Sequence, residues 1–214
     1  MIQLYAIDVQ RLPDPKEEPG MLRYLHGERK IQTMKYLQTD DRKRSLGAGI
    51  LLGEVLPRHG ASPEEITRSP QGKPQAAGIC FNLSHSGHLA ICAVGHRPVG
   101  CDIEKIAPEP AKVGEHFFHP GEIALLNRCE KEMRGELFFR LWTIKESYLK
   151  MTGEGLRRPL NSFEILIDRQ DVQVRRGEEI LPCHIREYPV PGYRVSVCAL
   201  EQSFAPNIVY INPS

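Results

Sequence analysis

A short β-type segment occurs twice in this chain, at positions separated by almost half of its 214 residues. Residues 91–94 are Ile-Cys-Ala-Val, and residues 197–200 are Val-Cys-Ala-Leu. Each segment ends a predicted hairpin, and a long amphipathic helix precedes each hairpin. Chance similarity between buried strands would also explain four matching residues, but the shared order of helix and hairpin favours an internal duplication. We therefore expect an α+β fold of two related halves, residues 1–106 and 107–214, with the functional site between them.

The periodicity of the apolar residues predicts the elements of both halves. Predicted strands cover residues 2–9, 79–83, 89–94, 99–103, 163–167, 172–175, 184–188 and 193–200. Predicted helices cover residues 21–37, 39–59, 120–129 and 135–151, and Thr39 or Asp40 can cap the second of these. A proline-rich break at residues 107–110 separates the halves.

Composition excludes several classes of protein. Apolar residues make up 41% of the chain and charged residues 26%, which is typical of a globular protein with a proper core. The apolar runs are too short to span a bilayer and no secretory signal is present, so we expect a cytoplasmic protein whose six scattered cysteines are free thiols. A net charge of +1 argues against bulk electrostatic binding to nucleic acid or membrane.

Two acidic residues are two positions apart at the end of the strand predicted over residues 99–103. Because side chains alternate along a strand, Asp102 and Glu104 point to one face and Cys101 and Ile103 to the other. Such close carboxylates repel each other unless a cation lies between them, which makes the pair a candidate Mg²⁺ site. The alternative is an exposed acidic strand end that pairs with Lys105.

The helix that follows adds a third carboxylate. Trp142, Glu146 and Lys150 are spaced four residues apart and therefore form one stripe along the helix. Three carboxylates and a lysine suit a metal-bound pyrophosphate better than a hydrolytic pair, because Mg²⁺ completes its coordination with phosphate oxygens and water. The alternative is an ion pair within the helix, which contributes only ~0.3 kcal/mol.

Two further segments carry groups that suit an anion. Ser84 and His85 stand at a strand end close to Gly87, where hydroxyl, imidazole and backbone donors can face a phosphate. The stretch 28–44 has an excess of basic residues. That excess indicates either a phosphate-binding rim or a solvated helix face.

These segments, in their order and spacing, resemble the surfactin-synthetase-activating type of 4′-phosphopantetheinyl transferase. The motifs that carry the resemblance are Gly72-Lys73-Pro74, Phe81-Asn82-Leu83-Ser84-His85-Ser86, Val99-Gly100-Cys101-Asp102-Ile103-Glu104 and Trp142-Thr143-Ile144-Lys145-Glu146-Ser147-Tyr148-Leu149-Lys150. The resemblance covers most of the chain, and the length fits the pseudo-dimeric class that acts as a monomer.

The resemblance implies a specific activity. Enzymes of this family transfer the phosphopantetheine arm of coenzyme A to a serine of an acyl or peptidyl carrier protein, as in nonribosomal peptide, polyketide or fatty acid synthesis, and release adenosine 3′,5′-bisphosphate. By motif match, the Mg²⁺ ligands are Asp102, Glu104 and Glu146. The coenzyme A contacts are Arg29, Arg44, Lys73, Ser84, His85 and Lys150.

Catalysis is expected from Glu146 and Lys150. Lys150 would neutralise charge on the pyrophosphate, and Glu146, directly or through a water, is the candidate base for the carrier serine. One departure from the family pattern is Gln32, one helical turn after Arg29, where a second basic residue is expected.

Two other classes of function remain open from the residues alone. One is a carrier-protein or nucleotide-binding module without catalysis, and the other is a Mg²⁺-dependent phosphotransferase that acts on a small molecule. The family resemblance also implies an acidic partner helix beside the modified serine. We therefore expect the carrier protein to dock at residues 153–159, where Arg157 and Arg158 would steer it.

Overall fold

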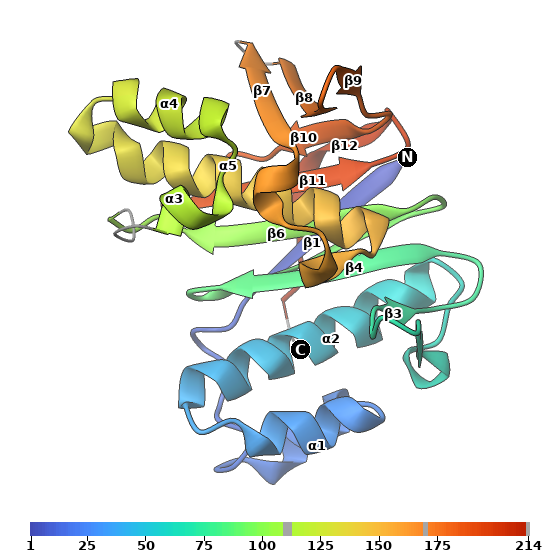
Figure 1. Ribbon diagram of the computed structural model, residues 1–214. Coiled ribbons are helices and arrows are strands. Elements are labelled where there is room, and N and C mark those ends of the chain that lie inside the picture. Colours follow the sequence, from blue (N-terminus) through green and yellow to red (C-terminus); the bar gives the residue numbers. More distant parts are fainter. Residues whose placement is uncertain (109–112, 169–170, 213–214) are drawn as a thin grey trace.

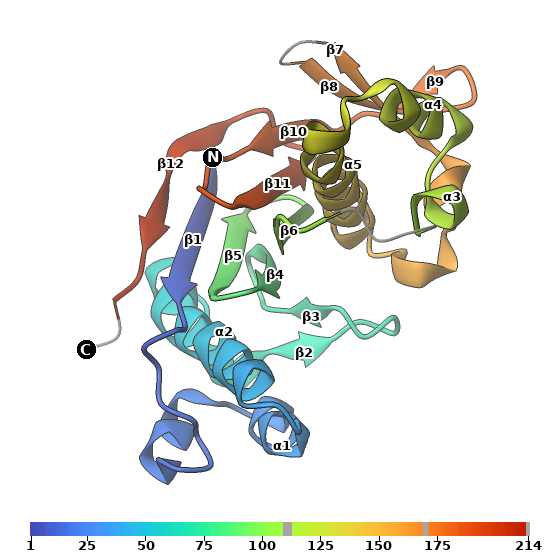
Figure 2. The same ribbon diagram turned by 90° about the vertical axis from the view of Figure 1, so that its left-hand side faces the viewer.

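The computed structural model describes residues 1–108, 113–168 and 171–212, so that positions 109 and 110 of the predicted proline-rich break lie outside the described residues. Two β-sheets lie face to face between two long helices, α2 (Thr39–Arg58) and α5 (Lys131–Thr152) (Figure 1 and Figure 2). The expected α+β class is confirmed. No helix in the described part of the chain is long and apolar enough to cross a membrane.

The two main sheets exchange strands between the halves of the chain. The first has the order β12 (Phe204–Tyr210), β1 (Ile2–Asp8), β5 (Leu89–Gly95), β4 (Cys80–Ser86). The second has the order β10 (His184–Glu187), β11 (Tyr193–Ala199), β6 (Val99–Lys105). β6 thus pairs with a strand of the second half and β12 pairs in parallel with β1. The sheets therefore do not follow the expected boundary at residue 106.

Smaller elements surround these layers. A hairpin of β2 (Thr67–Arg68) and β3 (Pro74–Gln75) precedes β4, and β7 (Glu164–Asp168), β8 (Asp171–Arg176) and β9 (Glu179–Ile180) form an outer sheet. The remaining helices are α1 (Glu28–Lys35), α3 (Val113–Phe117) and α4 (Pro120–Arg128). Short 3₁₀ turns cover Pro19–Tyr24, Pro63–Glu65, Gly155–Arg157 and Leu160–Ser162.

The helix predicted over residues 21–37 is wrong as a single element. A 3₁₀ turn at Pro19–Tyr24 and α1 are separated by residues 25–27, because Gly27 has a φ of 53°, a conformation that no helix contains. The cap of α2 also differs from the expectation. Gln38 holds the N-cap position, and no side chain bonds to the helix end there.

Apolar side chains form three clusters, one in each space between layers. Leu46, Ile50 and Val55 of α2 pack on one face of the first sheet. Ile91 of β5 and Cys101 of β6 belong to the cluster between the two sheets. The third cluster packs α5 against Leu126 of α4, Ile165 of β7 and Val174 of β8. The six cysteines are free thiols, as expected.

Gly100 allows α5 to lie directly against β6. A Cβ atom at Gly100 would be 2.1 Å from the carbonyl oxygen of Ser147 and 2.3 Å from the amide nitrogen of Met151, distances that real atoms do not adopt. The glycine therefore sets how close α5 comes to the strand that carries Asp102.

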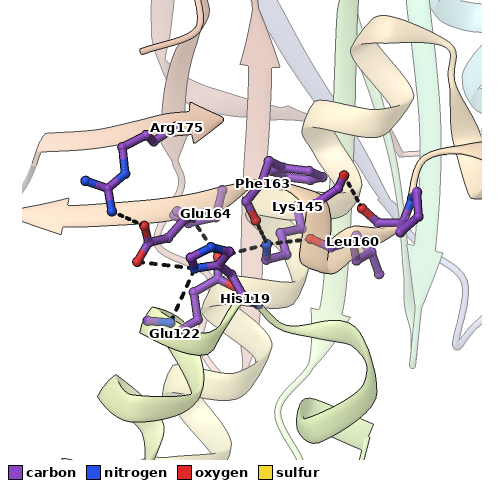
Figure 3. A network of polar contacts seen from close by, with 11 residues as sticks. His119, Glu122, Lys145, Leu160, Phe163, Glu164 and Arg175 are labelled. Carbon is purple, nitrogen blue, oxygen red and sulfur yellow. Dashed lines mark hydrogen bonds and ion pairs between the residues drawn. The ribbon is translucent and has the colours of Figure 1, made fainter. Parts of the chain in front are cut away.

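A buried lysine anchors α5 on its other side. The side chain of Lys145 is fully buried, and its Nζ lies 2.8 Å from Glu122 Oε1 of α4. Figure 3 draws this network of polar contacts. The same ammonium donates to the carbonyl oxygens of Leu160, at 2.8 Å, and Phe163, at 2.6 Å. One charge therefore holds α4, α5 and the start of β7 together, with its bonding capacity filled.

Candidate active site

The acidic residues of β6 face α5, as the alternation along the strand predicts. Cys101 and Ile103 point into the core between the sheets, whereas Asp102 and Glu104 line a cavity of about 540 Å³ on the opposite face. Asp102 is buried and Glu104 is half-buried. Neither is the exposed strand end of the alternative interpretation.

Polar side chains of β4 hold these carboxylates in place. Asn82 Oδ1 accepts a hydrogen bond from the amide of Cys101 at 2.9 Å. Ser84 Oγ donates to Asp102 Oδ1 and Ser86 Oγ donates to Glu104 Oε2, both at 2.7 Å. β4 and β6 belong to different sheets and are not paired through their backbones. Side chains of every second residue of β4 form the hydrogen bonds to β6 instead.

The helical stripe reaches the same cavity. Trp142, Glu146 and Lys150 all line it, as the four-residue spacing predicts. Lys150 Nζ donates to Asp102 Oδ1 at 2.6 Å and to Ser84 Oγ at 3.1 Å. Lys150 thus pairs with Asp102 across α5 and β6, and not with Glu146 along the helix as in the alternative interpretation.

Burial and charge change the ionisation of these groups. Burial raises the pKa of Glu104 and of Glu146, and the neighbouring carboxylate of Asp102 raises both further. Burial alone would lower the pKa of Lys150, but its contact with Asp102 outweighs burial and the pKa is raised. A further positive charge in the cavity would therefore stabilise the ionised forms of these carboxylates.

Asp102 retains an unused acceptor. Its Oδ2 atom is buried and has no hydrogen-bond partner among the described residues. A buried carboxylate oxygen normally has a partner, so the atom suits a cation that is not part of the chain. Among the described residues, no group of three or more His, Cys, Asp or Glu side chains is arranged so that it could hold a metal ion by itself. An open site of few protein ligands is what Mg²⁺ accepts.

The expected coenzyme A contacts divide between two places. Those that line the 540 Å³ cavity are Arg29, Ser84, His85 and Lys150. Burial lowers the pKa of His85, and the nearby guanidinium of Arg44 lowers it further, so that the imidazole is neutral at pH 7. Arg44 itself does not line this cavity. It donates to the carbonyl oxygen of Gly87 at 3.0 Å and pairs with Asp41 at 2.6 Å.

Lys73 lies in a second cavity of about 1120 Å³, which adjoins the first at Pro74 and Phe81. Its ammonium donates to the carbonyl oxygens of Val99, Lys150 and Met151. Lys73 therefore caps the end of α5. Arg157 and Arg158 line the same cavity, and Arg158 is paired with Glu154.

The sequence analysis missed two residues of the site. Ser86 holds Glu104, and its spacing of two from Ser84 along a predicted strand was the signal for that role. Arg68 lines the cavity beside Arg29. It precedes the Gly72 motif in a segment that gave no local signal.

Comparison with known proteins assigns the family. A family model described as the 4′-phosphopantetheinyl transferase superfamily matches residues 98–198. The 4′-phosphopantetheinyl transferase Sfp of Bacillus subtilis is 30% identical over 219 residues, which cover 99% of this chain and 98% of the relative. The 4′-phosphopantetheinyl transferase gsp of Aneurinibacillus migulanus is 35% identical over 175 residues, or 79% of this chain and 74% of the relative.

A solved structure of a holo-(acyl-carrier-protein) synthase from Bacillus anthracis, in complex with coenzyme A (3′,5′-ADP), covers 50% of this chain and 96% of its own, at 20% identity and a TM-score of 0.42. The segment that matches the family contains β6 and α5, the two elements that supply the carboxylates and the lysine of the cavity. Since similarity to Sfp extends along almost the whole chain, the protein belongs to the 4′-phosphopantetheinyl transferase superfamily.

Proposed function

We propose that this protein transfers the 4′-phosphopantetheine arm of coenzyme A to a serine of an acyl or peptidyl carrier protein in a Mg²⁺-dependent reaction, and releases adenosine 3′,5′-bisphosphate. Family membership supports the transfer. The observation that supports the metal is the buried, unpartnered Oδ2 of Asp102 beside two further carboxylates and Lys150.

The proposed Mg²⁺ ligands are Asp102, Glu104 and Glu146. Oxygen ligands of this kind fit a hard divalent cation. A bound cation would also offset the burial and the charge of Asp102, which raise the pKa values of Glu104 and Glu146. When bound, Mg²⁺ neutralises charge that develops on the pyrophosphate oxygens.

The chain's own residues supply the rest of the chemistry. Lys150 binds the pyrophosphate oxygens, and Ser84 and His85 orient the same group. The serine oxygen of the carrier bonds to the phosphorus that bears the pantetheine arm. The bond from that phosphorus to the bridging oxygen breaks, and adenosine 3′,5′-bisphosphate leaves with this oxygen. Glu146 accepts the serine proton, directly or through a water.

Arg29, Arg44 and Lys73 complete the proposed coenzyme A contacts. Arg29 already lines the cavity. Arg44 and Lys73 bond to the protein itself, so their contacts with the ligand require it to displace those bonds.

The carrier protein is proposed to dock on the second half of the chain, at residues 153–159. Arg157 is exposed there, whereas Arg158 is held by Glu154, so Arg157 has the charge that an acidic partner would meet first. We propose a monomer as the active form, because residues of β6 and of α5 in the same chain line one cavity together.

The test of this function is the mass of a purified apo-carrier protein after incubation with the enzyme and coenzyme A. We expect the carrier to gain one phosphopantetheine arm when Mg²⁺ is present and not when EDTA is added. A carrier whose serine is replaced by alanine is the control. Coenzyme A binding without transfer would instead indicate a non-catalytic module, and transfer only to a small molecule would indicate another phosphotransferase.

A further inference from the structure

Two cysteines lie side by side on the face of the second sheet that packs on α5. In the register of β10 with β11, Ile185 is opposite Cys198 and His184 is opposite Ala199. Because side chains alternate along a strand, Cys183, which directly precedes β10, shares the face of Ile185 and is diagonally across from Cys198. Both cysteines belong to the apolar cluster around α5, and their thiols share a hydrogen bond. The two sulfur atoms are therefore neighbours in the fold.

The two thiols differ in their access to solvent. Cys198 is fully buried, whereas Cys183 is half-buried. The hydrogen bond with Cys198 lowers the pKa of Cys183, although burial acts in the opposite direction. The same hydrogen bond and burial raise the pKa of Cys198 well above its ordinary value. Cys183 is therefore the thiol that ionises first and that a reagent in solution can reach.

Cys80 provides the matched contrast. It is half-buried like Cys183, but burial raises its pKa and the ammonium of Lys73 offsets only part of that effect. Partial exposure alone therefore does not single out Cys183. The hydrogen-bonded second thiol does, because it both favours the thiolate and stands ready to react with an oxidised sulfur.

The pair lies beneath the end of α5. Cys198 Sγ is 3.7 Å from Met151 Sδ, and Met151 directly follows Lys150 in that helix. A covalent change at Cys198 would therefore alter the packing of the helix end that carries Lys150.

We propose that Cys183 and Cys198 form a reversible disulfide when the protein is exposed to a hydroperoxide, and that Cys183 is the sulfur oxidised first. This inference goes beyond the proposed function and does not depend on it, because it involves neither coenzyme A nor a carrier protein.

The reaction has two steps. The thiolate sulfur of Cys183 bonds to one oxygen of hydrogen peroxide, the bond between the two oxygens breaks, and the leaving hydroxide takes up the thiol proton as water. Cys198 sulfur then bonds to Cys183 sulfur, the bond from sulfur to oxygen breaks, and the oxygen leaves as water with the proton of Cys198. In total the two thiols lose two electrons and two protons, and one peroxide is reduced to two waters.

The test is peptide mapping of the native protein after oxidation with hydrogen peroxide and blocking of the remaining thiols with N-ethylmaleimide. Trypsin cleaves after Arg176, Arg186 and Arg194, so the two cysteines fall in peptides 177–186 and 195–214, each with no other cysteine. We expect these peptides to be joined, with a mass two hydrogens below their sum, and to separate after dithiothreitol. Cys80 should remain a thiol at the same peroxide concentration.

Three variants assign the roles. Cys198→Ala removes the second sulfur, so a sulfenic acid should accumulate on Cys183 and be trapped by dimedone at least about fivefold more than in the wild type. Cys183→Ser should leave Cys198 unreactive toward peroxide, because Cys198 is buried. Cys129→Ser, at another half-buried cysteine, is the control and should form the joined peptides as the wild type does. Absence of the joined peptides from the oxidised wild type, or a disulfide between any other two cysteines, would overturn the proposal.

Discussion

At the scale of single residues, Asp14 holds the chain between α1 and α2. Its carboxylate is buried and accepts hydrogen bonds from Arg42 Nε at 2.8 Å, from Arg42 Nη2 and from the amide of Lys16. The bond from Arg42 keeps the pKa of Asp14 far below the usual carboxyl range, despite its burial. Arg42 also donates to the carbonyl oxygens of Tyr36 and Leu37, which directly follow the end of α1.

The sign of the pH dependence follows from this shift. A carboxyl whose pKa is lower in the folded state stabilises the fold above the unfolded pKa of about 4, and this stabilisation is lost as the pH falls toward the folded value. Asp14→Asn should therefore unfold in less urea than the wild type at neutral pH, with the difference shrinking below about pH 4. Asp171→Asn, at an exposed site, is the control. A difference that persists unchanged in acid would contradict this role of Asp14.

The site residues that follow from the periodicity of a single strand or helix were predictable from the sequence. The alternation of β6 places Asp102 and Glu104 on one face, and the four-residue spacing of α5 places Glu146 and Lys150 on one stripe. Arg68 was not predictable in this way, because its role depends on how the hairpin of β2 and β3 lies against α1. No local periodicity encodes such an approach of distant elements.

At the scale of elements, the contact of α5 with β6 decides the geometry of the site. Gly100→Ala should force the two apart, since its Cβ would overlap Ser147 O. We expect a lower melting temperature and a lower transfer rate, because Glu146 and Lys150 move away from Asp102. The matched control is Gly53→Ala in α2, where nothing lies within 4 Å of the added Cβ and the helix should gain about 0.5–1 kcal/mol. Equal melting temperatures for both variants would contradict the close approach.

The buried pair of Lys145 and Glu122 permits a second test at this scale. Lys145→Ala leaves Glu122 as an uncompensated buried charge, which costs about 3–5 kcal/mol. The double variant Lys145→Met and Glu122→Gln removes both charges and should lose less stability than the single variant. Urea unfolding of the two proteins decides this, and a double variant less stable than the single one would count against the pair.

Element boundaries were predictable where the apolar period is uninterrupted and uncertain where a backbone turn interrupts it. The pattern of α2 and α5 was read correctly to within a few residues, because each buries one continuous stripe. Gly27 interrupts the first predicted helix through its positive φ.

At the scale of the whole molecule, the exchange of β6 and β12 between the sheets was not predictable from the sequence. Pairing of β12 with β1 joins residues about 200 positions apart, and no local signal specifies such a pairing. The consequence is functional. β6 carries Asp102 on a strand of the second sheet while Ser84 holds it from the first, so both sheets build the site.

The proposed docking surface leads to a prediction for the intact protein. Arg157→Glu should raise the apparent KM for the carrier protein, leave coenzyme A affinity unchanged and flatten the dependence of the rate on salt, because exposed charges act mainly on association. Arg58→Glu, at an exposed arginine of α2 that pairs with Glu54, is the control. An unchanged KM at low salt would place the docking surface elsewhere.

The central claim is that a cation held by Asp102 supports transfer. Asp102→Asn tests it most directly, since the amide oxygen can still accept from Ser84 and Lys150 while the charge is lost. The measurement is the rate of transfer to an apo-carrier protein across a Mg²⁺ titration, with melting temperature and coenzyme A affinity followed in parallel and Asp171→Asn as the control. We expect a folded variant that binds coenzyme A and transfers at least about 100-fold more slowly at every Mg²⁺ concentration. Transfer at the wild-type rate in millimolar Mg²⁺ would contradict the claim.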